Sequence, residues 1–357
     1  MNDTAPGPLG ALVSVVKNQY IWGIAAIALL LIINLIGDPS YLAITVSDSG
    51  DLVGNVIDIL RAAAPIMMIA VGMCLVVATK GIDLSVGSVM VVAGAVAMEY
   101  LSSVGSPDSI GAALVAVVLV VVVSGALGAV NAILVSVVGL QPFISTLVLM
   151  LAGRGLAKVI TSGQNTSAQN EAFSWIANGR VFGFPAIFLI ALAIVILVGL
   201  LVRRSALGLM LEAIGMDAQA ARLAGVNRRA LLFAVYILSG VLAGIAGIFA
   251  TATVMTVDVS RTGYQLELDA ILAVVIGGTS LAGGKFNITG ATIGAILIAT
   301  LDKTVVFLGI SSSATPAFKA VIIIALVLLQ SERVRSAFRT RRVARPRAEK
   351  KKEEVAA

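Results

Sequence analysis

The residue types that carry most enzymatic chemistry are scarce in this sequence. Its 357 residues include no histidine and a single cysteine, Cys74, which lies inside an apolar run. Ser-His-Asp and Cys-His catalysis are therefore excluded, as are an internal disulfide and a cysteine-based metal site. The segment GGTSLAGGKF, residues 277–286, lacks both the glycine spacing of a phosphate-binding loop and a Ser or Thr after Lys285. We expect no catalytic residue, cofactor or metal site on this chain.

Polar and charged side chains that lie inside apolar stretches of the sequence form the second group of candidate functional residues. A charged group at mid-membrane costs about 2.5–3.5 kcal/mol, so it normally faces a cavity or a partner charge. Asp58 and Arg61, three apart on one predicted helix face, suit an ion pair as well as a solute path. Asp83 or Ser85 is equally suited to cap the helix that follows. The candidates for a translocation path are Asp83, Ser85, Asn131, Gln141, Ser145, Thr146 and Asp269.

These polar residues are embedded in a very apolar chain. Hydrophobic residues make up 59% of the sequence and charged residues 12%, against about 45–50% and about 25% in soluble proteins. The mean hydropathy is +1.04, so too few charged side chains exist to cover a surface that faces water. A soluble enzyme, a disordered chain and a free nucleic-acid binder are poor fits. The surplus apolar surface must face lipid, which predicts a polytopic membrane protein.

Ten apolar runs predict an all-α, polytopic transmembrane bundle of about ten spans (eight to ten), because a spanning helix needs about 20 apolar residues. The runs lie at 20–37, 55–78, 84–101, 110–138, 143–160, 186–202, 230–256, 268–283, 287–309 and 316–330. The eighth and tenth runs are short, and one of them is a candidate re-entrant segment. We divide the chain into an N-terminal segment 1–19, a membrane domain 20–330 and a basic tail 331–357.

Charge predicts the orientation. With ten spans, the segments on one side hold Lys17, Lys80, the five arginines of 203–229, Lys285 and the ten basic residues of the tail. The opposite segments are mostly acidic, so the positive-inside rule places both termini in the cytoplasm. The net charge of +6 equals that of the tail, whose ten Lys/Arg and four Glu suit a cytoplasmic flank with some affinity for anionic membrane lipid. We expect no nucleic-acid partner.

The connection 203–229 has the shape of a docking element. Its stretch 211–224 is rich in alanine and predicts a short helix, with Gly225 as its stop. A small-faced helix outside the membrane fits a groove on another protein. On the opposite side, loop 161–185 is polar enough to meet a partner or a hydrophilic solute.

Four stretches in order carry a family resemblance. The segment EAIGMDAQAARLAGVN, residues 212–227, resembles the coupling loop of ABC-importer permeases. The stretches GIDLSVGS (81–88), LQPFISTL (140–147) with AGRG (152–155), and LDAILAVVIGGTSLAGG (268–284) resemble the ribose, xylose, arabinose and galactoside permeases. Within that sugar branch, the details are most similar to galactofuranose permeases. The resemblance runs from about residue 55 to 330 and implies the ABC-importer permease fold.

The resemblance also implies a role and partners. This chain would be the permease of a bacterial sugar importer in the inner membrane, passing a monosaccharide that is galactofuranose-like or another pentose or hexose. A separate ATPase subunit would bind ATP and Mg, a periplasmic binding protein would deliver the sugar, and a second copy or a sister permease would complete a dimer. The residues expected to couple to the ATPase are Glu212, Ala213, Gly215, Asp217, Ala220, Ala221, Gly225 and Asn227.

Two alternatives stay open at this point. One is an ABC permease for nucleosides or branched-chain amino acids, which have related folds. The other is a proton-coupled secondary transporter, for which Asp269 or Asp302 would serve as the deep carboxylate. The coupling loop is the feature that argues against the second alternative.

Overall fold

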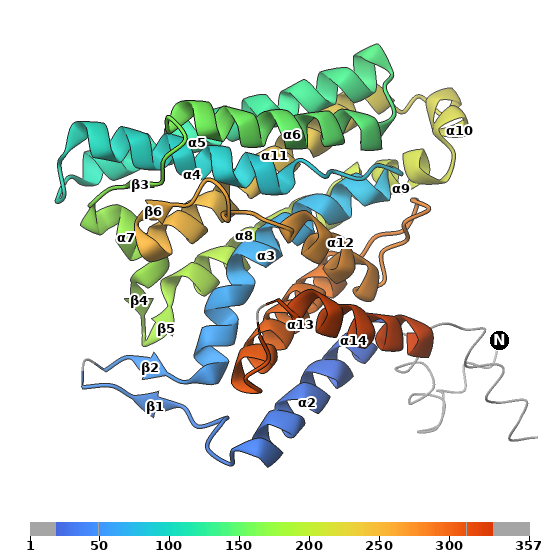
Figure 1. Ribbon diagram of the computed structural model, residues 1–357. Helices are drawn as coiled ribbons and strands as arrows, with labels where there is room; N and C mark the ends of the chain where they lie inside the picture. The colour runs from blue at the N-terminus through green and yellow to red at the C-terminus, as the bar shows by residue number, and fades with distance from the viewer. Residues whose placement is uncertain (1–18, 49, 312, 331–357) are drawn as a thin grey trace, which may run out of the picture.

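The computed structural model describes residues 19–48, 50–311 and 313–330, which form a bundle of helices with three very short antiparallel strand pairs (Figure 1). The N-terminal segment before residue 19 and the basic tail lie outside the described residues. The helices that follow the predicted runs are α2 (Gln19–Gly37), α3 (Asn55–Ala78), α4 (Val86–Val104), α5 (Ile110–Ile133), α6 (Pro142–Ile160), α8 (Ala186–Arg204), α11 (Arg228–Val254), α12 (Leu266–Ile276), α13 (Ile288–Phe307) and α14 (Thr315–Gln330).

Every predicted apolar run therefore contains a helix, which confirms the all-α polytopic class. Within the described residues, seven helices are long and apolar enough to cross a membrane. Helix α12 has only 11 residues, or about 16 Å at 1.5 Å per residue, about half of the hydrocarbon thickness. Irregular backbone at 277–287 continues from it. Such backbone is tolerated at membrane depth where protein surrounds it.

The core is centred on α3, in which every residue from Ile66 to Ala78 is buried. Helices α11, α12 and α13 pack around it, and α4 packs in turn on α11. Glycines allow the closest approaches between helices: a Cβ on Gly240 of α11 would lie 3.0 Å from the Cα of Gly128 on α5. Helices α5, α6 and α8 lie outside and expose apolar side chains, as lipid-facing helices do.

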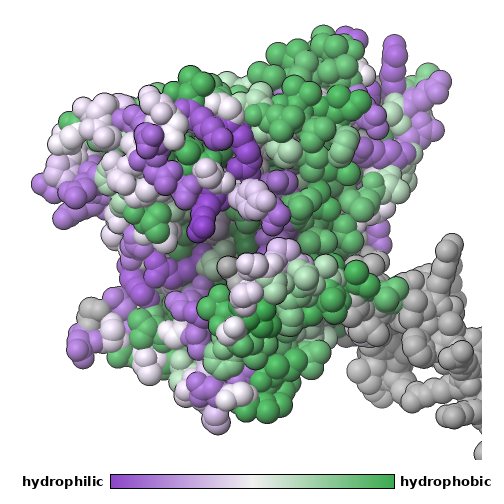
Figure 2. All heavy atoms as spheres, viewed as in Figure 1, coloured by the Kyte–Doolittle hydropathy of each residue, from purple (hydrophilic) through white to green (hydrophobic). Residues whose placement is uncertain are grey.

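The remaining elements gather at the two ends of the bundle. The two-residue strands pair antiparallel as β1 (Thr45–Val46) with β2 (Leu52–Val53), β3 (Thr166–Ser167) with β6 (Thr256–Val257), and β4 (Arg180–Val181) with β5 (Phe184–Pro185). They lie with α7 (Glu171–Asn178) at the left of Figure 1, whereas α9 (Leu207–Met216) and α10 (Ala218–Leu223) lie at the right. Figure 2 shows hydrophilic residues at both of these ends and hydrophobic residues between them.

Candidate functional site

The segment expected to dock on an ATPase is two helices rather than the single helix predicted over 211–224. The backbone is extended at Asp217, with φ −149°, and the chain turns there from α9 into α10. The Oδ1 atom of Asp217 accepts hydrogen bonds from the backbone N–H groups of Gln219 (2.8 Å) and Ala220 (3.0 Å). An aspartate that caps a helix start in this way is non-helical itself, so it interrupts the Ala-rich stretch.

The caps of this segment fix where each helix begins and ends. Hydrogen bonds from the backbone of Ala220 and Gln219 lower the pKa of Asp217, so the cap is ionised at neutral pH. Gly225 follows α10 with φ +85°, the left-handed conformation that glycine adopts freely, and confirms the predicted stop. Asn227 then caps α11 by accepting from the N–H of Ala230 at 3.1 Å.

Gly215 lies where three segments of the chain meet. A Cβ at this position would overlap the carbonyl oxygen of Ala78 and the backbone nitrogen of Gly284, and would lie 2.9 Å from the Cα of Gly284. The N–H of Gly284 donates to the carbonyl of Ala78 at 3.0 Å, and the Nζ of Lys80 donates to the carbonyl of Met216 at 3.1 Å. The end of α9 is thus packed directly on the end of α3 and on the 277–287 loop. We call this contact the Gly215 junction.

The eight predicted coupling residues divide into packed and exposed positions. Gly215 and Ala221 are buried, and Glu212 and Ala213 are half-buried. The exposed members are Asp217, Ala220, Gly225 and Asn227. Two apolar side chains beside them, Met216 at 67% and Leu223 at 85% exposure, were not predicted. Contact of these two side chains with another protein stays a prediction.

Four of the predicted path residues form one enclosed hydrogen-bond network with Ser239 of α11. Asp83 Oδ1 accepts from the Ser85 hydroxyl at 2.6 Å, and its Oδ2 accepts from the Ser239 hydroxyl at 2.8 Å. Asn131 of α5 donates to the Ser85 hydroxyl at 2.9 Å and accepts from the Ser145 hydroxyl of α6 at 3.2 Å. None of these side chains is more than 2% exposed, so the network joins the turn before α4 to α5, α6 and α11 within the protein.

The other predicted path residues are placed differently. Thr146 is buried and donates to the carbonyl of Ile82 at 3.0 Å, whereas Gln141 is exposed at the start of α6. The predicted cap at α4 is wrong, because Ser85 occupies the N-cap position without a side-chain bond to the helix. The carboxylate of Asp83 instead accepts from the N–H of Ser85 at 3.0 Å, which makes the turn before α4. A path role for these residues stays a prediction.

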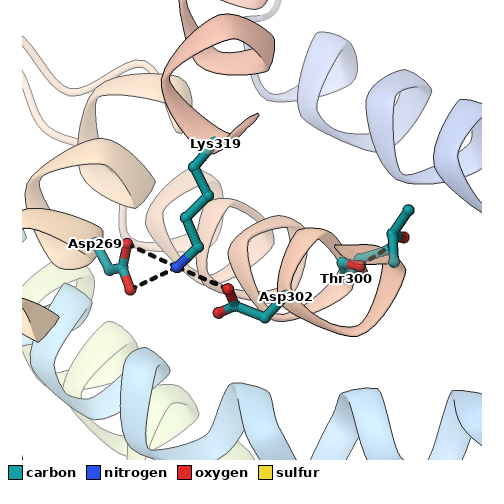
Figure 3. Close-up of polar contacts among 5 residues, drawn as sticks. Asp269, Thr300, Asp302 and Lys319 are labelled. Atoms are coloured by element: carbon teal, nitrogen blue, oxygen red, sulfur yellow. Dashed lines mark hydrogen bonds and ion pairs between the residues drawn. The ribbon is translucent and has the colours of Figure 1, made fainter. Parts of the chain in front are cut away.

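Asp269 lies apart from that network, in an ion cluster with Lys319 and Asp302 (Figure 3). The Nζ of Lys319 on α14 lies 3.1 and 3.0 Å from the two carboxylate oxygens of Asp269 on α12, and 2.8 Å from Oδ1 of Asp302 on α13. Asp269 and Lys319 also line a cavity of about 750 Å³ between α12 and α14, together with Tyr264 and Gln265. The lining of this cavity offers hydroxyl, amide and charged groups.

The predicted pair of Asp58 with Arg61 does not form. Asp58 pairs instead with Lys303 of α13 at 2.6 Å, and Arg61 donates to the Oδ1 atom of Asn178 in α7 at 2.8 Å. Both side chains are thus used between helices rather than along one helix.

Comparison with known proteins decides the family. The model of the family described as "Branched-chain amino acid transport system / permease component" matches residues 55–330. This chain belongs to that permease family. It is 50% identical to the fructose import permease protein FruF of Bifidobacterium longum, over 89% of each chain. It is 40% identical to the galactofuranose transporter permease protein YtfT of Escherichia coli (89% of this chain, 92% of the relative), and 38% identical to the ribose import permease protein RbsC of that organism (86% and 92%). No solved structure matches the chain significantly.

These relatives identify the chain as a permease component of the ABC sugar-importer type and confirm the sugar branch. Sequence reasoning on this permease missed Ser239, Gly284 and Lys319, each of which contacts a predicted residue from a distant part of the chain. One signal was present for Lys319: a lysine in an apolar run requires a nearby carboxylate. Ser239 and Gly284 had no such signal, because serine and glycine are common in membrane helices and their turns.

Proposed function

We propose that this permease forms the passage for a monosaccharide and that a separate ATPase subunit drives it through α9 and α10. The Gly215 junction is the observation that carries the proposal. It places the end of α9 on the backbones of both α3 and the 277–287 loop, with no side chain between them to absorb a displacement. A force applied to exposed Met216 and Leu223 would therefore reach the core helix α3 and the half-length helix α12.

Each polar end of the bundle is assigned to a different partner. The ATPase, with its ATP and Mg, contacts α9 and α10, while a periplasmic sugar-binding protein contacts the end formed by α7 and loop 161–185. A second permease copy or a sister permease completes the dimer. The described start of α2 and end of α14 lie on the same side as α10 (Figure 1), which supports two cytoplasmic termini in a bacterial inner membrane.

The substrate proposed is a sugar that can take the five-membered ring form. The relatives' names give fructose, galactofuranose and ribose, all of which form furanose rings. The higher identity to the fructose permease extends the expectation from galactofuranose to ketohexoses. The cavity between α12 and α14 supplies hydrogen-bonding groups, including Gln265 and Tyr264, for hydroxyl groups in passage.

The alternatives lose support from the same structure. A proton carrier requires a carboxylate that is free to change its charge along the path, but Asp269 and Asp302 are both paired with the ammonium group of Lys319 in an ion cluster between helices. Branched-chain amino acids appear in the description of the family, whereas the three relatives above are named for sugars.

Uptake by a reconstituted complex tests the proposal. The full-length chain is purified from native membranes with the proteins that accompany it, and the complex is placed in vesicles loaded with ATP. We expect ATP-dependent uptake of labelled fructose, ribose or galactofuranose, without uptake of leucine or of a nucleoside. Uptake that follows a pH gradient and ignores internal ATP would refute it, and so would ATP-driven uptake of leucine alone.

A further inference from the structure

A basic groove lies beside α10, outside the Gly215 junction. It is a hollow of about 810 Å³, within the range of about 300–1,000 Å³ that is typical of small-molecule sites. One wall is the five-residue π-helix Leu134–Val138 at the end of α5, and the other is formed by α10 and the start of α11. Its described lining includes three arginines, Arg222, Arg228 and Arg229, and contains no carboxylate.

The arginines of the groove are not matched by acidic neighbours. None of the three forms an ion pair with a carboxylate in the part of the chain that the structure describes. Arg228 and Arg229 are also the first residues of the 27-residue helix α11, whose N-terminus carries a partial positive charge. The positive-inside rule accounts for arginines on this side of the membrane, but not for their convergence on one hollow.

A buried hydroxyl gives an independent sign that the groove holds a ligand. Ser136, on the π-helix, lines the groove and is 8% exposed. Its Oγ is buried and has no hydrogen-bond partner among the described residues. An unpaired buried polar group costs about 1–3 kcal/mol, and an absent ion or ligand is one physical explanation for such a group. A hydroxyl donor that shares one lining with three arginines fits an oxyanion.

We propose that this groove binds a phosphate group, supplied by the headgroup of an anionic phospholipid. Guanidinium groups recognise phosphate through paired, charge-assisted hydrogen bonds. The rim favours a lipid over free phosphate, because Val137 and Val138 of the π-helix are 55% and 60% exposed and provide an apolar surface for acyl chains. The groove faces the inner leaflet of the membrane if α10 is cytoplasmic, so the placement of the groove at that leaflet rests on the proposed function. Binding at the groove itself does not require transport.

Lipid titration of the purified full-length permease in neutral detergent tests the proposal, with bound lipid counted by native mass spectrometry. We expect phosphatidylglycerol to bind at least tenfold more tightly than phosphatidylcholine. The double variant Arg228→Gln/Arg229→Gln should lose this preference. The control Arg203→Gln/Arg204→Gln removes the same charge from the end of α8, outside the groove lining, and should keep it.

Ser136→Ala separates a binding role from a structural one. It should weaken phosphatidylglycerol binding about tenfold, the value of one hydrogen bond to a charged group. Without lipid it should leave the melting temperature unchanged or raise it, because it removes an unpaired buried hydroxyl. If Ser136→Ala lowers the melting temperature by the same amount with and without lipid, the proposal is overturned.

Inorganic phosphate distinguishes the two sources of the anion. Displacement of phosphatidylglycerol by millimolar phosphate would show a phosphate site open to both sources, while a lack of displacement would show that the acyl chains are needed. If both double variants lose the lipid preference equally, the preference is a general effect of positive charge and the proposal is overturned. So would an arginine variant that keeps the lipid preference but no longer assembles with the ATPase, because the groove would then belong to that interface. Transport activity enters none of these readouts.

Discussion

Replacing Gly215 with alanine is the sharpest perturbation that the structure suggests. The added methyl group would overlap the carbonyl oxygen of Ala78 and the backbone nitrogen of Gly284, so backbone rather than a flexible side chain must move. Overpacking of this kind costs about 1–3 kcal/mol, and movement of two backbone segments favours the upper end. A cost of about 3 kcal/mol corresponds to roughly a hundredfold shift between the packed and the separated junction.

The assay measures coupling separately from folding. We expect Gly215→Ala to insert into the membrane and to assemble with the ATPase, while sugar uptake and the stimulation of ATP hydrolysis by loaded binding protein fall at least tenfold. Gly199→Ala on α8 is the matched control, because nothing lies within 4 Å of its added Cβ. Normal uptake and stimulation by Gly215→Ala would refute the view that this junction transmits motion.

Three further perturbations test other parts of the structure. Asp217→Ala should reduce uptake several-fold by removing the cap of α10, whereas Asp217→Asn keeps an acceptor and should not. Because backbone hydrogen bonds lower the pKa of Asp217, the cap is complete above the ordinary aspartate pKa and is lost only as pH falls through the lower folded value. The ratio of Asp217→Ala to wild-type uptake should therefore stay constant between about pH 6 and 8. Lys319→Met should lower the free energy of unfolding by about 3 kcal/mol, since it leaves Asp269 and Asp302 without a cation, and adding Asp269→Asn and Asp302→Asn should restore the melting temperature. A reporter that is active only in the periplasm should be silent after Ala357, and a strong signal there would reverse the topology.

The sequence predicts the helices well because lipid imposes a simple requirement on them. A span must be apolar over its length and must satisfy its own backbone, so the apolar runs and the helices nearly coincide. The break at Asp217 was predictable in principle, since an aspartate before an Ala-rich stretch is a strong helix start. Side-chain partners were not predictable, because Asp83 and Ser239 are 156 residues apart and meet only through packing.

The 277–287 loop and α12 connect the Gly215 junction with the cavity between α12 and α14. The 277–287 loop touches the Gly215 junction at Gly284, and α12, which precedes the loop, lines the cavity between α12 and α14 with Leu268, Asp269 and Leu272. Glycines lock α12 onto α13: a Cβ on Gly294 would lie 2.8 Å from the Cα of Ala273. A displacement of α9 would therefore move α12 and α13 together, while α14 is held to them by Lys319.

The cavity lies between the moving pair and α14, so its shape depends on both the junction and the ion cluster. If the two are coupled in this way, the losses of uptake in Gly215→Ala and Lys319→Met should not add in the double variant. Two sites that act independently would give additive losses on a logarithmic scale, within about 0.3–0.5 kcal/mol. Additivity within that error would mean that the junction acts through α3 alone, and that the 277–287 loop follows the motion without transmitting it.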